Sequence, residues 1–174
     1  MQVFGSPASR QSVTPAGRGQ GAPPGGTSTW GDQGVDGGAA REIWPSARPP
    51  AAPDRFVWVL ETVAELPLVR AEVRAHLAGP QLSDLRDRLV LALDEMASNA
   101  LRHGGGHVRA TVRPLADSWL IEVCDGAPGT PPSPAVDRDP SEGGLGLYLI
   151  AELATDHGWY VTAGTKHVWA VLTP

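Results

Sequence analysis

A long helical pattern between Ser83 and His103 constrains the fold of this chain more than any other feature. Its apolar positions recur at helical spacing and fall at Leu89, Leu93, Met96 and Ala100. Ser83 belongs to a residue type that caps helix N-termini, and three glycines from Gly104 end the pattern. The sequence therefore predicts a helix that buries one stripe and leaves another side free.

The free side of this predicted helix carries an acid and an amide. Glu95 and Asn99 are four residues apart, so at about 100° per residue they share one face, one turn apart. A carboxylate and a carboxamide oxygen suit Mg²⁺, which prefers oxygen ligands and usually shares them with substrate phosphates. The alternative is a solvated pair on an exposed helix face, and the pair by itself favours that alternative.

The rest of the chain alternates between strand and helix patterns. In order, we expect a strand at 55–60, a helix at 65–77, the long helix at 83–103, strands at 107–115 and 119–124, a loop at 125–144, a helix at 145–154, and strands at 159–163 and 167–172. This order predicts an α+β fold, a two-layer sandwich in which a mixed, mostly antiparallel sheet carries its helices on one face.

The first 53 residues differ in composition from the rest. Glycine and proline supply 18 of them, more than the roughly 25–30% at which low complexity becomes the better interpretation. Trp30 and Trp44 are isolated exceptions in a segment that cannot bury enough surface to offset its ordering entropy. We therefore expect a disordered tail over residues 1–53 and one folded domain over residues 54–174.

Charge and apolar patterning argue against two classes of partner. The net charge is −5 and no basic run occurs, so we expect no direct nucleic-acid binding. No stretch approaches the roughly 20 apolar residues that a spanning helix needs, so we expect no membrane contact. The single cysteine, Cys124, cannot form an internal disulfide, which favours a reducing, cytoplasmic setting.

A second candidate site follows the apolar strand that ends at Cys124. Asp125 stands at the strand end, with Gly126 and Gly129 close behind it. One interpretation is a turn in which the Asp125 side chain binds its own backbone two residues on. The other is a buried carboxylate that accepts a hydrogen bond from an exocyclic amine such as that of adenine, with glycines that let the backbone approach a flat ring.

A third candidate site is the glycine-rich segment that leads into the predicted helix at 145–154. Gly143, Gly144 and Gly146 stand at this junction. Free backbone N–H groups and the helix dipole meet at such a place and favour a phosphate. The segment lacks the Lys-Ser/Thr pair of a Walker A loop, and taken alone it is a weak signal.

Together, the three segments resemble the GHKL-type nucleotide-binding domain shared by gyrase, heat-shock chaperone ATPases, histidine kinases and mismatch-repair ATPases. The resemblance covers about residues 55–174 and implies the Bergerat-type ATP-binding fold. Within that superfamily the chain is most similar to the bacterial anti-sigma-factor serine/threonine kinases. They share the run from Glu95 to Gly104 and an ending like that at 168–172.

The resemblance implies a role for each segment. Glu95 would be the general base, Asn99 would hold Mg²⁺, and Asp125 would bind the adenine amino group. The remaining nucleotide contacts would come from Gly126, Gly129, Gly143, Gly144, Leu145, Gly146 and Leu147. The segment 130–142 would act as a mobile lid.

Two positions depart from the family pattern. Ala127 stands where the first glycine motif usually has Gly, and His167 stands near the base where relatives often have Thr. A third departure is the proline-rich segment 130–142, which is acidic at 137–139 and has Arg138 as its one candidate cation for the γ-phosphate. Since this third departure bears on phosphate transfer, the resemblance implies nucleotide binding more directly than catalysis.

The resemblance further implies an ATP- and Mg²⁺-dependent kinase that sequesters a sigma factor and phosphorylates a serine or threonine of an anti-anti-sigma partner. The resemblance leaves open whether the protein forms a homodimer. The alternative is a catalytically weak ATP-binding adaptor that acts only through regulated protein contacts. A histidine kinase fragment is disfavoured, because no dimerising hairpin with a phosphoacceptor His precedes the predicted domain.

Overall fold

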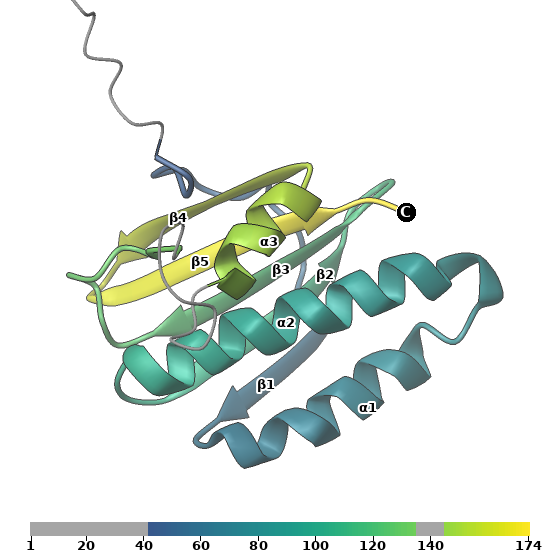
Figure 1. Ribbon diagram of the computed structural model, residues 1–174, viewed down its shortest axis with the longest axis horizontal. Helices are drawn as coiled ribbons and strands as arrows, with labels where there is room; N and C mark the ends of the chain where they lie inside the picture. Colours follow the sequence, from purple (N-terminus) through teal and green to yellow (C-terminus); the bar gives the residue numbers. More distant parts are fainter. Residues whose placement is uncertain (1–41, 135–144) are drawn as a thin grey trace, which may run out of the picture. The chain divides into compact units, whose positions relative to one another are not determined.

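The computed structural model describes residues 42–134 and 145–174, and the predictions for residues 1–41 lie outside this range. Five strands form one sheet in the order β1-β2-β3-β5-β4, and every neighbouring pair is antiparallel. The strands are β1 Phe56–Leu60, β2 Val108–Pro114, β3 Trp119–Asp125, β4 Asp156–Thr162 and β5 Thr165–Leu172. Figure 1 shows this order across the sheet.

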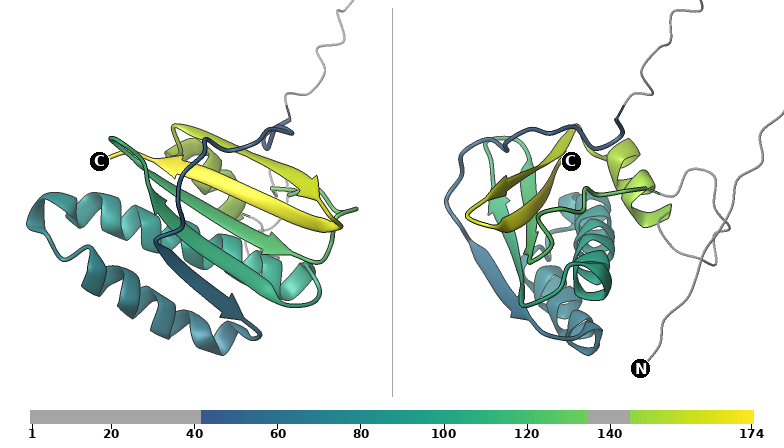
Figure 2. Two further views of the ribbon diagram at one scale, coloured as in Figure 1. Left: turned by 180° about the vertical axis from the view of Figure 1, so that it is seen from behind. Right: turned by 90° about the vertical axis from the view of Figure 1, so that its left-hand side faces the viewer.

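The α-helices of the described residues all lie on one face of the sheet, as the right-hand view of Figure 2 shows. They are α1 Leu66–His76, α2 Ser83–His103 and α3 Leu145–Leu153. Short 3₁₀ turns at Val63–Glu65 and Pro80–Leu82 lead into α1 and α2. This arrangement confirms the predicted α+β sandwich with helices on one face.

Helix α2 provides the centre of the core. The four apolar residues predicted to form its buried stripe are each at most 2% exposed: Leu89, Leu93, Met96 and Ala100. They pack on Ile121 and Val123 of β3 within one hydrophobic cluster. Because alternate residues of a strand face opposite sides, Leu120 and Glu122 of β3 lie on the face without helices.

The N-terminal cap predicted for α2 is wrong. Ser83 already has helical backbone angles, and Leu82 occupies the cap position without a side-chain hydrogen bond. The 3₁₀ turn at Pro80–Leu82 runs directly into the helix, so the chain needs no separate capping side chain at Ser83.

A segment before β1 packs along the outer edge of β4. Trp44 is 1% exposed, and its indole N–H donates to the Leu147 carbonyl at 3.2 Å. Ser46 forms a parallel bridge with Trp159, and the Ala47 N–H donates to the Trp159 carbonyl at 2.9 Å. This packing differs from the predicted boundary at residue 54, because a single buried tryptophan and edge pairing hold a segment that has no periodic pattern.

In the described ranges 42–134 and 145–174, no helix combines the length and the apolar character that crossing a membrane requires.

Candidate functional site

The structure brings the predicted general base and the glycine-rich segment together. Glu95 and Asn99 are both half-buried on α2, one turn apart, while Met96 between them is buried. Gly146, in the first turn of α3, lies so close to Glu95 that a methyl group at this glycine would overlap the Glu95 carboxylate. The base predicted on α2 therefore stands at the N-terminal turn of α3, where backbone N–H groups favour an anion.

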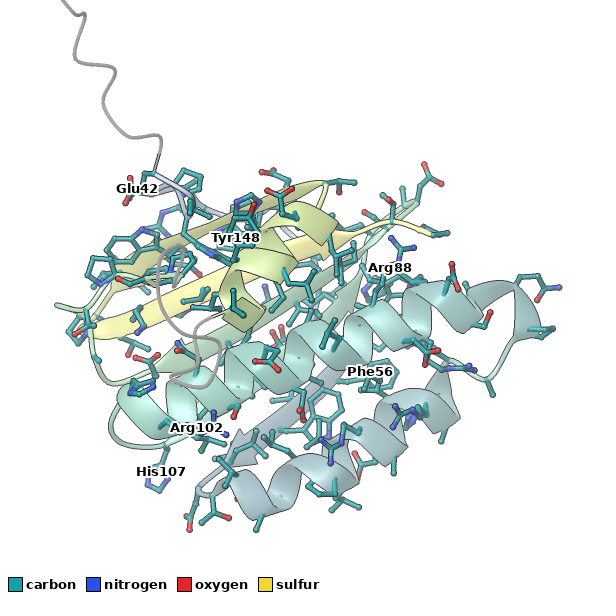
Figure 3. The ribbon with its side chains drawn as sticks, viewed as in Figure 1. Glu42, Phe56, Arg88, Arg102, His107 and Tyr148 are labelled. Carbon is teal, nitrogen blue, oxygen red and sulfur yellow. The ribbon has the colours of Figure 1, made fainter. Side chains whose placement is uncertain are left out.

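The end of α2 meets the second predicted segment in the same way. A methyl group at Gly104 would overlap the Asp125 side chain and would lie 2.6 Å from the Ala100 carbonyl oxygen. The Gly126 N–H donates to the Gly105 carbonyl at 3.0 Å. Figure 3 shows Arg102 and His107 near this end of α2. Close backbone approach here requires residues without side chains.

Asp125 lies at the end of β3 with its side chain 1% exposed. Its Oδ1 accepts a hydrogen bond from the Ala127 N–H at 2.9 Å, which confirms the predicted turn two residues on. Its Oδ2 lies 3.1 Å from the Lys166 ammonium nitrogen, and the Lys166 side chain is 3% exposed. The turn bond does not exclude a ligand, since each carboxylate oxygen has two lone pairs.

Lys166 is the residue of this pocket that the sequence analysis missed. It stands directly opposite Asp125 in the β3–β5 register and also donates to the Thr130 carbonyl at 3.2 Å. The available signal was that this residue is the only lysine of the chain and stands just before an apolar run at 168–172.

The prediction that His167 lies near the base is wrong. His167 is the neighbour of Lys166 on β5, so its side chain faces the opposite side of the sheet. There its Nδ1 lies 2.8 Å from Glu122 Oε1 and 3.0 Å from Cys124 Sγ.

Glu122 is the centre of a polar cluster on the face without helices. The Tyr160 hydroxyl donates to Oε1 at 2.6 Å, and an Arg113 nitrogen lies 2.7 Å from Oε2. Glu122, Cys124 and His167 have donor atoms close enough together to hold a metal ion. Because the Arg113 cation already neutralises the carboxylate, the cluster is explained without one.

Burial governs ionisation in this cluster. It raises the pKa of the Cys124 thiol to about 12, and the Glu122 carboxylate adds to the effect. Burial also raises the pKa of Tyr160, whose hydroxyl donates to Glu122. Both groups therefore stay protonated at neutral pH, and neither is an activated nucleophile.

The remaining predicted residues have different outcomes. Gly143, Gly144 and residues 135–142 of the predicted lid lie outside the described residues. Leu147 is buried in the core, and Leu145 is exposed at the start of α3. A methyl group at Gly129 would meet no atom within 4 Å, so no neighbour in the described structure requires glycine there.

A groove of about 720 Å³ lies elsewhere, between α3 and the segment that contains Glu42. Glu42 and Tyr148 line it, and both are labelled in Figure 3. Glu95, Asn99 and Asp125 do not line this groove, so it is separate from the candidate site.

The donor chemistry of the candidate site fits a nucleotide with Mg²⁺. Asn99 and Glu95 supply oxygen atoms, which Mg²⁺ prefers, beside a helix N-terminus that favours phosphate. Asp125 supplies a buried acceptor, and the glycines at 104 and 146 let the backbone lie closer to Asp125 and Glu95 than a residue with a side chain would allow.

Comparison with known proteins shows which family the chain is similar to. Residues 59–172 match the histidine kinase-like ATPase domain family. The signal transduction histidine-protein kinase AfsQ2 of Streptomyces coelicolor is 36% identical over an alignment of 88 residues, and the match covers 44% of this chain and 16% of AfsQ2. The solved structure of the Acinetobacter baumannii histidine kinase AdeS is 16% identical, with a TM-score of 0.39, and the match covers 68% of this chain and 67% of that chain. The chain thus spans about a sixth of the length of the curated relative that it matches.

Proposed function

This chain belongs to the histidine kinase-like ATPase family, and from that premise we propose that it is an ATP-dependent protein kinase of the anti-sigma type. In this role it phosphorylates a serine or threonine of an anti-anti-sigma partner and sequesters a sigma factor. Its ATP-binding domain is related to those of histidine kinases, which supports ATP as the phosphoryl donor in this proposal.

The observation that carries the proposal is the position of Glu95 beside Gly146. Phosphoryl transfer depends mainly on positioning and on neutralising charge, so one base and one anion-binding helix end can suffice. Glu95 accepts the proton of the attacking hydroxyl, while backbone N–H groups at the start of α3 hold the phosphates. Asn99 would hold Mg²⁺, which neutralises phosphate charge when bound.

The base end of the nucleotide lies at Asp125 in this proposal. The carboxylate accepts from the base, and the Gly104–Gly106 turn leaves room for a flat ring. Glu95 of α2 lies against Gly146 of α3. Asp125 of β3 lies against Gly104, the residue that directly follows α2. One rigid helix therefore sets the distance between the phosphate end and the base end of the site.

An ATP-binding adaptor without kinase activity is the second candidate. The buried Lys166–Asp125 pair favours it, because a carboxylate that is already neutralised gives a nucleotide less binding energy. Nucleotide state would then bias which protein partner is held, without phosphate transfer.

The substitution Glu95→Gln separates the two candidates. It removes the base and keeps the size and polarity of the side chain, so ATP binding should stay within about threefold while phosphate transfer falls by 10²–10⁴-fold, roughly the contribution of a general base. Transfer would be followed with γ-labelled ATP and each purified anti-anti-sigma protein of the source organism.

The chemistry of the label identifies the acceptor. A phosphoserine or phosphothreonine ester survives acid, whereas a phosphohistidine is lost in acid. Acid-stable label on the partner, absent with Glu95→Gln, supports the kinase. No transfer by the wild type, with ATP binding intact, supports the adaptor instead.

A further inference from the structure

Lys166 and Asp125 form a buried ion pair inside the candidate nucleotide pocket. Their charged atoms are 3.1 Å apart, and their side chains are 3% and 1% exposed. Both belong to the small group of buried polar residues among those the structure describes. The pair is thus part of the fold as well as of the site.

Three features hold the ammonium group in place. The β3–β5 register sets Lys166 directly opposite Asp125. Its Nζ also donates to the Thr130 carbonyl at 3.2 Å. Leaving either charge buried alone is strongly unfavourable, so the pair resists separation.

This arrangement changes what the carboxylate offers a ligand. A carboxylate alone accepts hydrogen bonds and therefore selects a base with an exocyclic amine, such as adenine. Here Oδ2 already accepts from the Lys166 ammonium, and Oδ1 accepts from the Ala127 N–H. An incoming amine must share an oxygen and approach a positive charge.

The ammonium group also offers something to a ligand. It has three N–H donors, and Asp125 and Thr130 account for two of them. The third can donate to a carbonyl oxygen, the group that a 6-oxopurine such as hypoxanthine or guanine carries where adenine carries its amine.

We propose that Lys166 determines the base specificity of this pocket and makes it accept 6-oxopurine nucleotides at least as tightly as ATP. The proposal rests on the proposed function, because it requires a nucleotide with its base at Asp125. It goes beyond that function by assigning the base class to one residue outside the family's motifs.

The test compares ATP with inosine triphosphate, which has an oxygen in place of the 6-amino group and a hydrogen on N1, and is otherwise identical. Calorimetric titrations of the full chain in Mg²⁺ give the ratio of the two dissociation constants. For the wild type we expect inosine triphosphate to bind as tightly as ATP or more tightly. The wild-type ratio needs no substitution, so it decides the proposal even if a variant does not fold.

The variant Lys166→Met removes the ammonium group and keeps a long, flexible side chain. We expect it to reverse the preference, so that ATP binds about tenfold or more tightly than inosine triphosphate, as one hydrogen bond to a charged group allows. The control is Arg70→Met. It removes a cation that lies 3.0 Å from Asp94 and is not part of the candidate site. It should keep the wild-type ratio.

Two results would overturn the proposal, and they differ in what else they overturn. A wild type that prefers ATP by tenfold removes the role of Lys166 and leaves the nucleotide site standing, whatever the ratio measured for Lys166→Met. No binding of either nucleotide at millimolar concentration, by wild type or variant, removes the proposed function as well.

Discussion

Two buried carboxylates stand three residues apart on β3 and face opposite sides of the sheet. Glu122, on the side without helices, has both oxygens bound by side chains of Tyr160, His167 and Arg113. Asp125, on the helix side, is bound by one side chain, that of Lys166, and by a backbone N–H of its own turn. Burial of an acid therefore does not by itself indicate a binding site.

The surroundings of the two acids explain the difference. Side chains from β2, β4 and β5 enclose Glu122, so no room is left for a ligand. Beside Asp125 the neighbouring chain is a glycine turn at 104–106, and a methyl group at its first position would overlap the carboxylate side chain. Side-chain partners on both oxygens favour a structural role for Glu122. A single side-chain partner, beside a glycine turn that packs closely on the carboxylate, favours a ligand at Asp125.

The largest expected effect concerns the structural acid. Glu122→Ala removes the acceptor of the Tyr160 hydroxyl, the partner of His167 and one of the two carboxylates paired with Arg113, which keeps Asp54 at 2.6 Å. Loss of these buried partners together should lower the free energy of unfolding by about 3–5 kcal/mol. ATP affinity of the folded fraction should change little, because the cluster lies on the other face. Urea unfolding and calorimetry measure the two quantities. A variant with normal stability and lost ATP binding would reverse the roles assigned to the two acids.

A smaller effect is expected on the helix side. Gly104→Ala places a methyl group against the Asp125 side chain and the Ala100 carbonyl, so it should cost about 1–3 kcal/mol of stability and weaken ATP binding. Gly79→Ala is the matched control, since its methyl group would make only ordinary contacts, the nearest at 3.5 Å, and Gly79 is not part of the candidate site. Equal behaviour of the two alanine variants in urea unfolding and ATP titration would contradict the idea that Gly104 keeps the site open.

The smallest expected effect is on the alkylation rate of the Cys124 thiol, and the stability of the fold at neutral pH should not depend on this group. Because the pKa of Cys124 is raised to about 12 when folded, the native thiol should alkylate far more slowly at pH 8 than the thiol in urea. The sign for stability follows from linkage. Below pH 9 both states keep the proton, whereas between pH 9 and about 12 the unfolded thiol ionises first and stability falls. Equal alkylation rates in the native and unfolded chains would contradict the burial of this thiol.

Much of the fold could be predicted because its longest elements have a regular local spacing of apolar residues. The predicted bounds 83–103 agree with α2, since the apolar spacing is regular and glycines end it. Strand β4 was predicted at 159–163 but begins at Asp156, because polar residues at its start hide a segment that pairs with β5.

Contacts between distant segments could not be predicted. Trp44 is buried against Leu147, more than a hundred residues away, and no local pattern at Trp44 indicates that contact. Lys166 faces Asp125 only because β3 and β5 pair in one register, and a shift of one residue would have placed His167 there. The motifs of the candidate site could be predicted, but the residue that neutralises its carboxylate could not.

The most direct test of the account is calorimetric titration with Mg·ATP of the wild type, Asp125→Asn and Glu122→Gln. The account predicts that the wild type binds, that Asp125→Asn loses most of this binding, and that Glu122→Gln keeps it, because only Asp125 faces the nucleotide. Loss of binding in Glu122→Gln with retention in Asp125→Asn, or no binding by the wild type at millimolar ATP, would contradict it.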